Sequence, residues 1–382
     1  MNAYGGSVMS ATPPGRITGI DLARAIAILG MFAMHTFYHE SPDLPVWRLF
    51  EGNSSVLFCV LAGVSVTFIA KNRSATDDTR QLITRGVILF AVGLLIAFPA
   101  VGPIVILTTY GVLYFLVAPW AVRLPLWCIA PLTVITMIGT PLLSWRIRQG
   151  MGAPWYGDAP GWHHFISHDW NAFWSALLLT GTFPVLTWIP FLLVGIIIGK
   201  HLLRRPIALF LGGAALYGIG RAVSWYVAHP FGFLDSFREQ YGDDLTDLLL
   251  SGAYGVTPTE SVYWDFIDIA HSGSITDIAT SVGVAAMVIA VCLVMPTFWL
   301  TYPLRCIGRM PLTIYVLHIL AIGWLNYHEM DIALPNYAWA NLLVPILIAS
   351  LWFVWFKRGP LEVIMSVVAG WSKKRERVLA RA

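Results

Sequence analysis

Charge is scarce in this chain. Only 12% of its 382 residues are Asp, Glu, Lys or Arg, whereas a typical soluble domain carries about 25%. Hydrophobic residues make up 57% of the chain, and apolar runs of roughly 17–25 residues recur along it, which is the length of a helix that crosses a bilayer. The composition therefore excludes an ordinary soluble domain and predicts an all-α, polytopic membrane protein.

Several common motifs are also missing. The chain has no P-loop, no GxGxxG after a strand and no GxSxG nucleophile elbow. It has four cysteines but no CxxC pair, so neither a disulfide framework nor a CxxC metal or redox site is expected. No basic and aromatic patch typical of nucleic-acid binding is visible, and no secretory signal peptide is apparent.

What is present is a series of about ten predicted spans within residues 17–356, which we interpret as one transmembrane domain. With the segment 1–16 placed in the cytoplasm, 19 of the 24 basic residues lie inside and 16 of the 21 acidic residues lie outside. The positive-inside rule therefore predicts that both termini are cytoplasmic. The predicted spans are 17–38, 54–71, 82–99, 103–122, 125–144, 184–202, 206–228, 276–298, 310–328 and 336–356.

Three polar segments complete the chain. The outer loop 145–183 holds three histidines, and the outer loop 229–275 carries eight acidic side chains. Both loops contain amphipathic pieces that suit the membrane interface or a cap on the bundle. The cytoplasmic tail 357–382 begins amphipathic and ends basic, which suits an anionic inner leaflet.

Polar groups share one stripe of the first predicted span. At about 100° per residue, Arg24 lies roughly 60° and His35 roughly 40° from Asp21, and His39 returns to the position of Asp21. Charged groups inside an apolar span are costly, so each is a candidate functional residue. The middle of the stripe is apolar, and the neighbouring flank is a candidate lipid-facing surface: Leu22, Ile26, Leu29 and Ala33.

His35 and His39 are the candidate catalytic histidines, because histidine titrates near neutral pH and suits proton or acyl transfer. The alternative is an interfacial histidine that only hydrogen-bonds a loop. His-x3-His is also a metal-ligand spacing, but the sequence fixes no third ligand, so no metal is expected. Asp21 and Arg24 indicate either a cytoplasmic gate for an anionic ligand or a structural ion pair at a helix start.

The second predicted span opens with a polar turn. Asn53, Ser54 and Ser55 follow a glycine, and they indicate either a helix cap or a site where backbone N–H groups hold an anionic or oxyanionic group. The same span has a face of small residues, which is expected to pack closely against another helix: Ser55, Cys59, Ala62 and Gly63.

Two later spans carry further candidates. Asp277 begins the eighth predicted span among hydroxyl side chains, where it caps the helix, pairs with His271 or orients His35; His271 is the alternative residue to orient the catalytic histidine. His318 lies in the middle of the ninth span with Tyr315 one turn earlier, and it fits either a hydrogen bond within the bundle or a catalytic role.

Seven segments, taken together and in order, resemble the bacterial YeiB-like (DUF418) group. This group is a distant relative of heparan-α-glucosaminide N-acetyltransferase within the transmembrane acyltransferase superfamily, and the resemblance runs over essentially all ten spans. The segments are GIDLARAIAILGMFAMH, GNSSVLFCVLAGVSV, ILTTYGVLYFLVAP, FPVLTWIPFLLVGIIIGK, HSGSITDIATSVGVAAMVI, GRMPLTIYVLHIL and RGPLE.

The resemblance implies a reaction. The lysosomal relative takes acetyl from cytosolic acetyl-CoA and delivers it to an amino sugar across the membrane, with its catalytic histidine between the first two spans. That place holds His35 and His39 here, and a histidine occupies the His35 position in the YeiB-like group, so His35 is expected first and His39 second. Bacterial members often have Arg where this chain has Asn53, which departs from their pattern.

The expected function is therefore a transmembrane acyltransferase of the bacterial plasma membrane. Acetyl-CoA or another acyl-CoA binds from the cytoplasm, and its pantetheine arm follows the stripe of the first span. His35 or His39 acts as general base or acyl carrier toward a hydroxyl or amine of an envelope glycan or lipid. The expected partners are membrane lipids and this acceptor, not nucleic acid, and a homodimer is left open. The donor phosphates are expected at some of Arg24, Arg80, Arg85, Arg305, Arg309 and Lys357.

A transporter or lipid-binding protein with a His/Asp proton relay is the second hypothesis. No inverted pair of broken helices, which many transporters contain, is visible in the sequence. A scaffold that positions envelope enzymes is the third.

Overall fold

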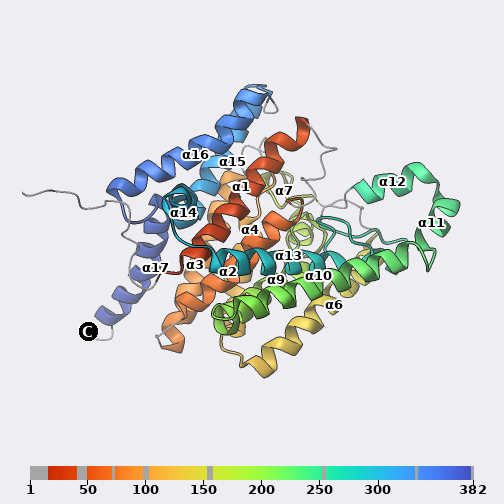
Figure 1. The fold of residues 1–382 in the computed structure, drawn as a ribbon, viewed down its shortest axis with the longest axis horizontal. Helices are drawn as coiled ribbons and strands as arrows, with labels where there is room; N and C mark the ends of the chain where they lie inside the picture. The colour runs from red at the N-terminus through yellow and green to blue at the C-terminus, as the bar shows by residue number, and fades with distance from the viewer. Residues whose placement is uncertain are drawn as a thin grey trace, which may run out of the picture.

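The computed structural model describes residues 16–40, 50–70, 74–97, 103–152, 158–251, 255–331 and 334–379 (Figure 1). Every regular element in these ranges is a helix, so the all-α prediction is confirmed. The side chain of His39 lies outside the described part of the chain.

Seven of the described helices are long and apolar enough to cross a membrane. The predicted number of about ten spans is not confirmed, although each predicted span coincides with a helix. α2 (Asn53–Ile69) and the segment of α4 (Leu107–Val112), η2 (Leu113–Val117) and α5 (Ala118–Ala121) are shorter. The seven are α1 (Thr18–Glu40), α3 (Ala75–Ile96), α6 (Leu126–Met151), α9 (Val185–Ile197) continued by η4 (Ile198–Leu202), α10 (Pro206–Ala228), α13 (Ile275–Val294) and α16 (Pro335–Trp355).

An eighth candidate span is broken. The helical pieces η6 (Trp299–Thr301) and α14 (Tyr302–Arg309) meet α15 (Pro311–Tyr327) at a bend of 78°. The bend falls at Met310, whose φ of −131° is not helical, because the following Pro311 disfavours a helical residue before it. α15 then starts anew with proline in its first turn, where the missing N–H costs nothing. Its start contacts the C-terminal helix α17 (Pro360–Leu379).

α1 lies in the middle of the bundle, against α2, α13, α14 and α16 (Figure 1). Of the flank expected to face lipid, only Leu22 is buried; Ile26, Leu29 and Ala33 are partly exposed, although Ile26 and Leu29 also pack against the core. Hydropathy does not distinguish these two apolar surroundings. α14 approaches α1 very closely at Gly308, because a Cβ at this position would lie 1.7 Å from the carbonyl oxygen of Asp21.

α2 and α9 cross closely at a pair of glycines. A Cβ built on Gly195 would lie 2.0 Å from the carbonyl oxygen of Val60, and one on Gly63 would lie 2.3 Å from that of Leu192. Gly63, one residue of the small-residue face predicted on the second span, therefore packs against another helix as expected, whereas Ser55 and Ala62 line cavities.

The two outer loops fold into short helices around small cores. α11 (Phe233–Tyr241), α12 (Asp243–Ser251) and η5 (Val262–Phe266) gather with the end of α10 around the buried Trp264. Arg148, near the end of α6, is almost fully buried and donates hydrogen bonds to the hydroxyl and carbonyl oxygens of Thr257. The other loop forms α7 (Trp162–Ile166), α8 (Trp170–Ser175) and η3 (Ala176–Thr180).

Candidate functional site

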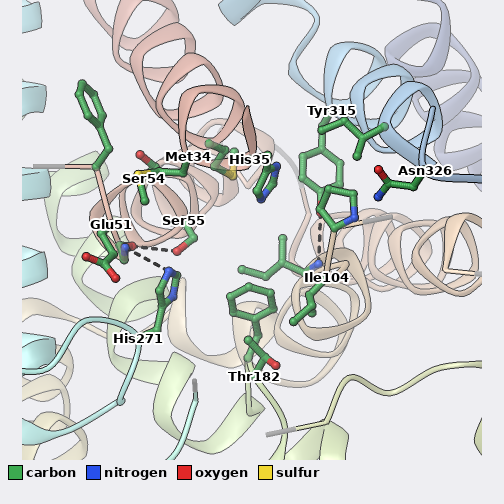
Figure 2. Close-up of a pocket in the computed structure, with 17 residues that line it drawn as sticks. Met34, His35, Glu51, Ser54, Ser55, Ile104, Thr182, His271, Tyr315 and Asn326 are labelled. Carbon is green, nitrogen blue, oxygen red and sulfur yellow. Dashed lines mark hydrogen bonds between the residues drawn. The ribbon is translucent and has the colours of Figure 1, made fainter. Parts of the chain in front are cut away.

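The first cavity lies where the histidine end of α1 meets the starts of α2 and α4 and the middle of α15. It has a volume of about 360 Å³ and is called the outer cavity here. Figure 2 shows His35 on its wall, with Ser54 and Ser55 to one side and Tyr315 to the other. The polar side chains that line it are His35, Glu51, Ser54, Ser55, Thr182, His271, Tyr315 and Asn326.

His35 is joined to two polar side chains from other helices. Its Nδ1 lies 2.8 Å from Nε2 of His318 on α15, and Nδ1 of His318 lies 2.9 Å from Oδ1 of Asn341 on α16. The His318 ring is 2% exposed and stacks on Phe32 of α1, with 3.6 Å between the ring centroids. Three helices therefore hold His35 in a chain of two part-buried hydrogen bonds.

His271 lines the same cavity but already has a structural role. Its Nε2 accepts a hydrogen bond from the backbone N–H of Gly52 at 3.1 Å, just before α2 (Figure 2). Burial lowers the pKa of His271 to about 4, so the ring is neutral at pH 7. Its φ of 62° is in the left-handed region, which non-glycine residues rarely occupy. His271 thus fixes the start of α2 from the cavity wall.

The anion site considered at the start of α2 is occupied by the chain itself. The N–H groups of Gly52, Asn53 and Ser54 donate to His271, Glu51 and Phe50, respectively. The hydroxyl of Ser55 donates to the Gly52 carbonyl. Donors already engaged are not available to a ligand, which argues against an oxyanion site. The side-chain cap predicted from Asn53, Ser54 and Ser55 is not formed either, because the N-cap of α2 is Gly52 and no side-chain hydrogen bond caps the helix.

Asp277 does not orient His35, which was one of the roles considered for it. Its Oδ2 accepts the N–H of Gly273 at 2.9 Å, and its Oδ1 accepts the hydroxyl of Ser281 at 3.2 Å. Its own N–H bonds to Ser274, the N-cap of α13. Asp277 therefore stabilises the turn into α13, and the residue beside His35 is His318.

A second cavity lies near the other end of α1 and has a volume of about 320 Å³; it is called the inner cavity here. Three of the five arginines expected to bind a donor line it, namely Arg24, Arg85 and Arg309. Arg80 and Arg305 are not among its lining residues. Guanidinium groups at an otherwise largely apolar wall suit a ligand with anionic groups and an uncharged arm.

Two carboxylates lie close to these arginines, and each has a defined partner. Asp21 accepts hydrogen bonds from Arg16 at 2.8 Å and from Arg24 at 3.1 Å, and Arg24 also donates to Ser65. Glu362 accepts the N–H groups of residues 312 and 313 at the start of α15. Asp21 and Arg24 thus form the structural ion pair, while Arg24 also lines the cavity. Glu362 caps a helix whose N-terminal dipole favours negative charge.

The two cavities meet at Tyr315, which belongs to a stack of three aromatic rings. Tyr315 lines both cavities, and it stacks with Phe58 at 6.3 Å between centroids, while Phe58 stacks with Tyr110 at 5.8 Å. The hydroxyl of Tyr315 accepts the N–H of Ile106 at 3.3 Å, and that of Tyr110 donates to the Ser55 carbonyl at 3.0 Å. Each tyrosine is therefore tethered at its tip, and the three rings are called the aromatic partition.

The apolar middle of the α1 stripe is not part of either cavity. Ala25, Ile28 and Phe32 are each 0% exposed, so the stripe is packed between Arg24 and His35. The route predicted along α1 for a pantetheine arm is therefore closed in this structure. The two cavities approach each other on another side, at the aromatic partition.

One group of side chains has the composition of a metal site. Asp158, His163 and His164 place their ligand atoms within 4.8 Å of one another in the outer loop. The N–H of Gly161 donates to Nδ1 of His164, so the neutral ring carries its proton on Nε2, which faces Asp158. Burial lowers the pKa of His164, which favours this neutral form. A metal would need the lone pair on Nε2, so the group fits a hydrogen-bonded cluster better than a metal site.

Sequence reasoning missed two polar groups, one half-buried and one buried. One is Asn341, an amide within the apolar run of α16, where a polar side chain is itself a signal. The other is the pair of Arg148 and Asp265. Asp265 is fully buried and accepts a hydrogen bond from the hydroxyl of Thr257 at 2.8 Å. Burial raises the pKa of Asp265 to about 6.

Two known families match the chain. The family described as "Heparan-alpha-glucosaminide N-acetyltransferase, catalytic" matches residues 16–229, which is more than half of the chain. The family described as "Protein of unknown function (DUF418)" matches residues 247–371. No curated protein matches the chain. The resemblance seen in the sequence is therefore confirmed, and with it a multi-pass membrane protein of acetyltransferase type.

Proposed function

Because the chain belongs to the family of the heparan-alpha-glucosaminide N-acetyltransferase catalytic domain, we propose that it transfers an acyl group, most simply acetyl, across the membrane. The donor is acyl-CoA in the inner cavity, and the acceptor is a hydroxyl or amine in the outer cavity. The observation that carries this proposal is the pairing of an arginine-lined cavity with a histidine-lined cavity across one aromatic partition.

The inner cavity supports the donor site. Phosphates bind well to guanidinium groups, and Arg24, Arg85 and Arg309 line this cavity. The rest of its lining is mostly aliphatic and aromatic, which suits an uncharged pantetheine arm. The acyl thioester at the end of this arm would then meet the aromatic partition.

The outer cavity supports the acceptor site, with His35 as general base. The acceptor hydroxyl or amine attacks the thioester carbonyl, and its proton passes to His35. The carbon–sulfur bond then breaks, and the thiolate takes up a proton to leave as coenzyme A. His39 remains the second candidate for the base. An envelope glycan or lipid is the proposed acceptor, and the bacterial plasma membrane, with the outer cavity facing the envelope, is the proposed location.

The test uses purified protein in lipid nanodiscs with radiolabelled acetyl-CoA. Glucosamine is the first acceptor, followed by fractions of a cell-envelope extract. We expect His35→Ala to lower kcat by about 100- to 10,000-fold, the usual contribution of a general base. His229→Ala is the matched control, because this histidine lies at the exposed end of α10. Full activity in His35→Ala, His39→Ala and the double variant would refute the mechanism.

The broken span keeps the transporter hypothesis as a second candidate, since transporters often build their sites from bent helices. Only one such bent pair is found among the described helices, whereas the common arrangement repeats it. Melting curves separate the two functions. Acetyl-CoA raises the melting temperature of an acyltransferase, whereas a transporter responds to its solute and not to any acyl-CoA.

A further inference from the structure

We propose that His318 and Asn341 are positioning residues that fix the tautomer of His35 and direct its basic nitrogen to acyl transfer. This inference rests on the proposed function, and it adds two residues on two other helices to the site. The juxtaposition is long-range, because His35 and His318 are 283 residues apart in the chain.

The two hydrogen bonds determine where each proton lies. An amide oxygen only accepts, so Oδ1 of Asn341 requires the proton of His318 on Nδ1. Nε2 of a neutral His318 then carries a lone pair, which accepts from the Nδ1–H of His35. The lone pair of His35 is therefore on Nε2. With Oδ1 of Asn341 facing Nδ1 of His318, no other assignment of neutral rings satisfies both contacts.

Packing holds this arrangement in place. Phe32 stacks on the His318 ring with an interplanar angle of 15°, and the planes of His35 and His318 differ by 12°. Breaking a buried hydrogen bond leaves a polar atom without its partner and costs about 1–3 kcal/mol. Rotation of either ring would break one or both bonds, so the tautomer is locked by the surrounding helices.

The locked tautomer suits a general base. When the acceptor attacks, its proton moves to Nε2 of His35, and the imidazolium keeps donating through Nδ1 to His318. Asn341 carries no charge, so it orients the pair without adding a counter-charge. The other titratable side chains on the wall of the outer cavity are Glu51, His271 and Tyr315.

The first test reads the tautomer directly. The protein is labelled with 15N-histidine in lipid nanodiscs, and the His35 signals are assigned by their loss in His35→Gln. Protonated and unprotonated ring nitrogens have well-separated 15N shifts. We expect a protonated Nδ1 and an unprotonated Nε2 on His35, and a mixture of both tautomers in Asn341→Leu. Asn336→Leu is the matched control, because this exposed asparagine lies at the start of the same helix.

The second test reads the function in the acyl-transfer assay. We expect Asn341→Leu to lower kcat by about 10- to 100-fold, as other partners that orient a histidine do, with little change in KM. Asn341→Asp keeps an acceptor at the same place. It should retain the tautomer and move the acid limb of the pH–rate profile up by about one unit, because a carboxylate stabilises the protonated histidines.

Each outcome decides the question. A proton on Nε2 of His35 in the wild type, or an unchanged tautomer in folded Asn341→Leu, would overturn the proposed positioning role of His318 and Asn341. An Asn341→Asp profile that coincides with that of the wild type would overturn its part in proton transfer. If His35 has the expected tautomer but no acyl transfer to any acceptor is found, the positioning role stands and the proposed function is wrong. The two failures are therefore distinguishable.

Discussion

Replacing Tyr315 with alanine should join the two cavities and relax the choice of acyl chain. The Tyr315 ring lines both cavities, and its hydroxyl is tethered to the N–H of Ile106. Truncation to alanine opens the aromatic partition at this ring, while Phe58 and Tyr110 remain. Space that the ring fills in the wild type then becomes available to a longer acyl group.

The magnitude follows from the apolar surface that this space buries. Each methylene moved from water to an apolar environment gains about 0.8 kcal/mol, which is roughly fourfold in kcat/KM. Butyryl-CoA has two methylenes more than acetyl-CoA, so it should gain up to about 15-fold relative to acetyl-CoA in Tyr315→Ala. Loss of a large buried ring also costs about 3–5 kcal/mol of stability, and the two neighbouring cavities favour the lower end.

The assay compares kcat/KM for acetyl-, butyryl- and hexanoyl-CoA in the wild type, Tyr315→Ala and Tyr315→Phe. The phenylalanine variant is the control, because it keeps the ring and loses only the bond to the Ile106 N–H. It should keep the preference of the wild type and melt at a lower temperature. The reasoning is refuted if folded Tyr315→Ala keeps the wild-type preference, or if Tyr315→Phe relaxes it equally.

Three further predictions concern other parts of the molecule. Arg24→Met should raise the Kd of coenzyme A by about tenfold or more in calorimetry, since a hydrogen bond to a charged group contributes about 1.5–3 kcal/mol, whereas Arg80→Met should not. Burial raises the pKa of Asp265 to about 6. Its favourable contribution to the stability of the folded state is therefore complete below pH 4 and is lost as the pH rises through 6. The melting temperature of Asp265→Asn, relative to that of the wild type, should therefore rise from pH 4 to pH 7. A difference that stays constant over this range would contradict the prediction. Gly195→Ala should lower the melting temperature because its Cβ meets a carbonyl oxygen at 2.0 Å, whereas Gly139→Ala, with nothing within 4 Å, should not.

The sequence predicts the positions of the helices because long apolar runs have few structural alternatives in a membrane. It does not predict which apolar faces meet lipid and which meet protein. Leu22 and Ile26 illustrate this, since both are apolar residues of one flank of α1, yet the tertiary packing buries Leu22 and leaves Ile26 partly exposed. The bend at Met310 had a local signal in the following proline.

Site residues could be predicted from the sequence where a polar side chain is energetically costly within an apolar helix. They could not be predicted where their role depends on a partner from another helix. Arg24 and His35 were selected as polar groups within an apolar span, and both line cavities. Asp277 was an equally reasonable partner for His35, but its carboxylate is used by its own turn. Helical phase gives the face on which a residue lies, and the identity of the facing helix is a property of the tertiary fold.

The packing of α1 changes the path that an acyl group would follow. The sequence placed this path along α1, because its polar ends and apolar middle share one stripe. In the structure that middle is closed, since Ile28 and Phe32 are fully buried. The cavities instead approach each other at Tyr315, which belongs to the broken span and lies one turn from His318 on the same helix. Movement of α15 would thus displace the partition and the partner of His35 together, so opening the partition and releasing the His35 tautomer are coupled through one helix.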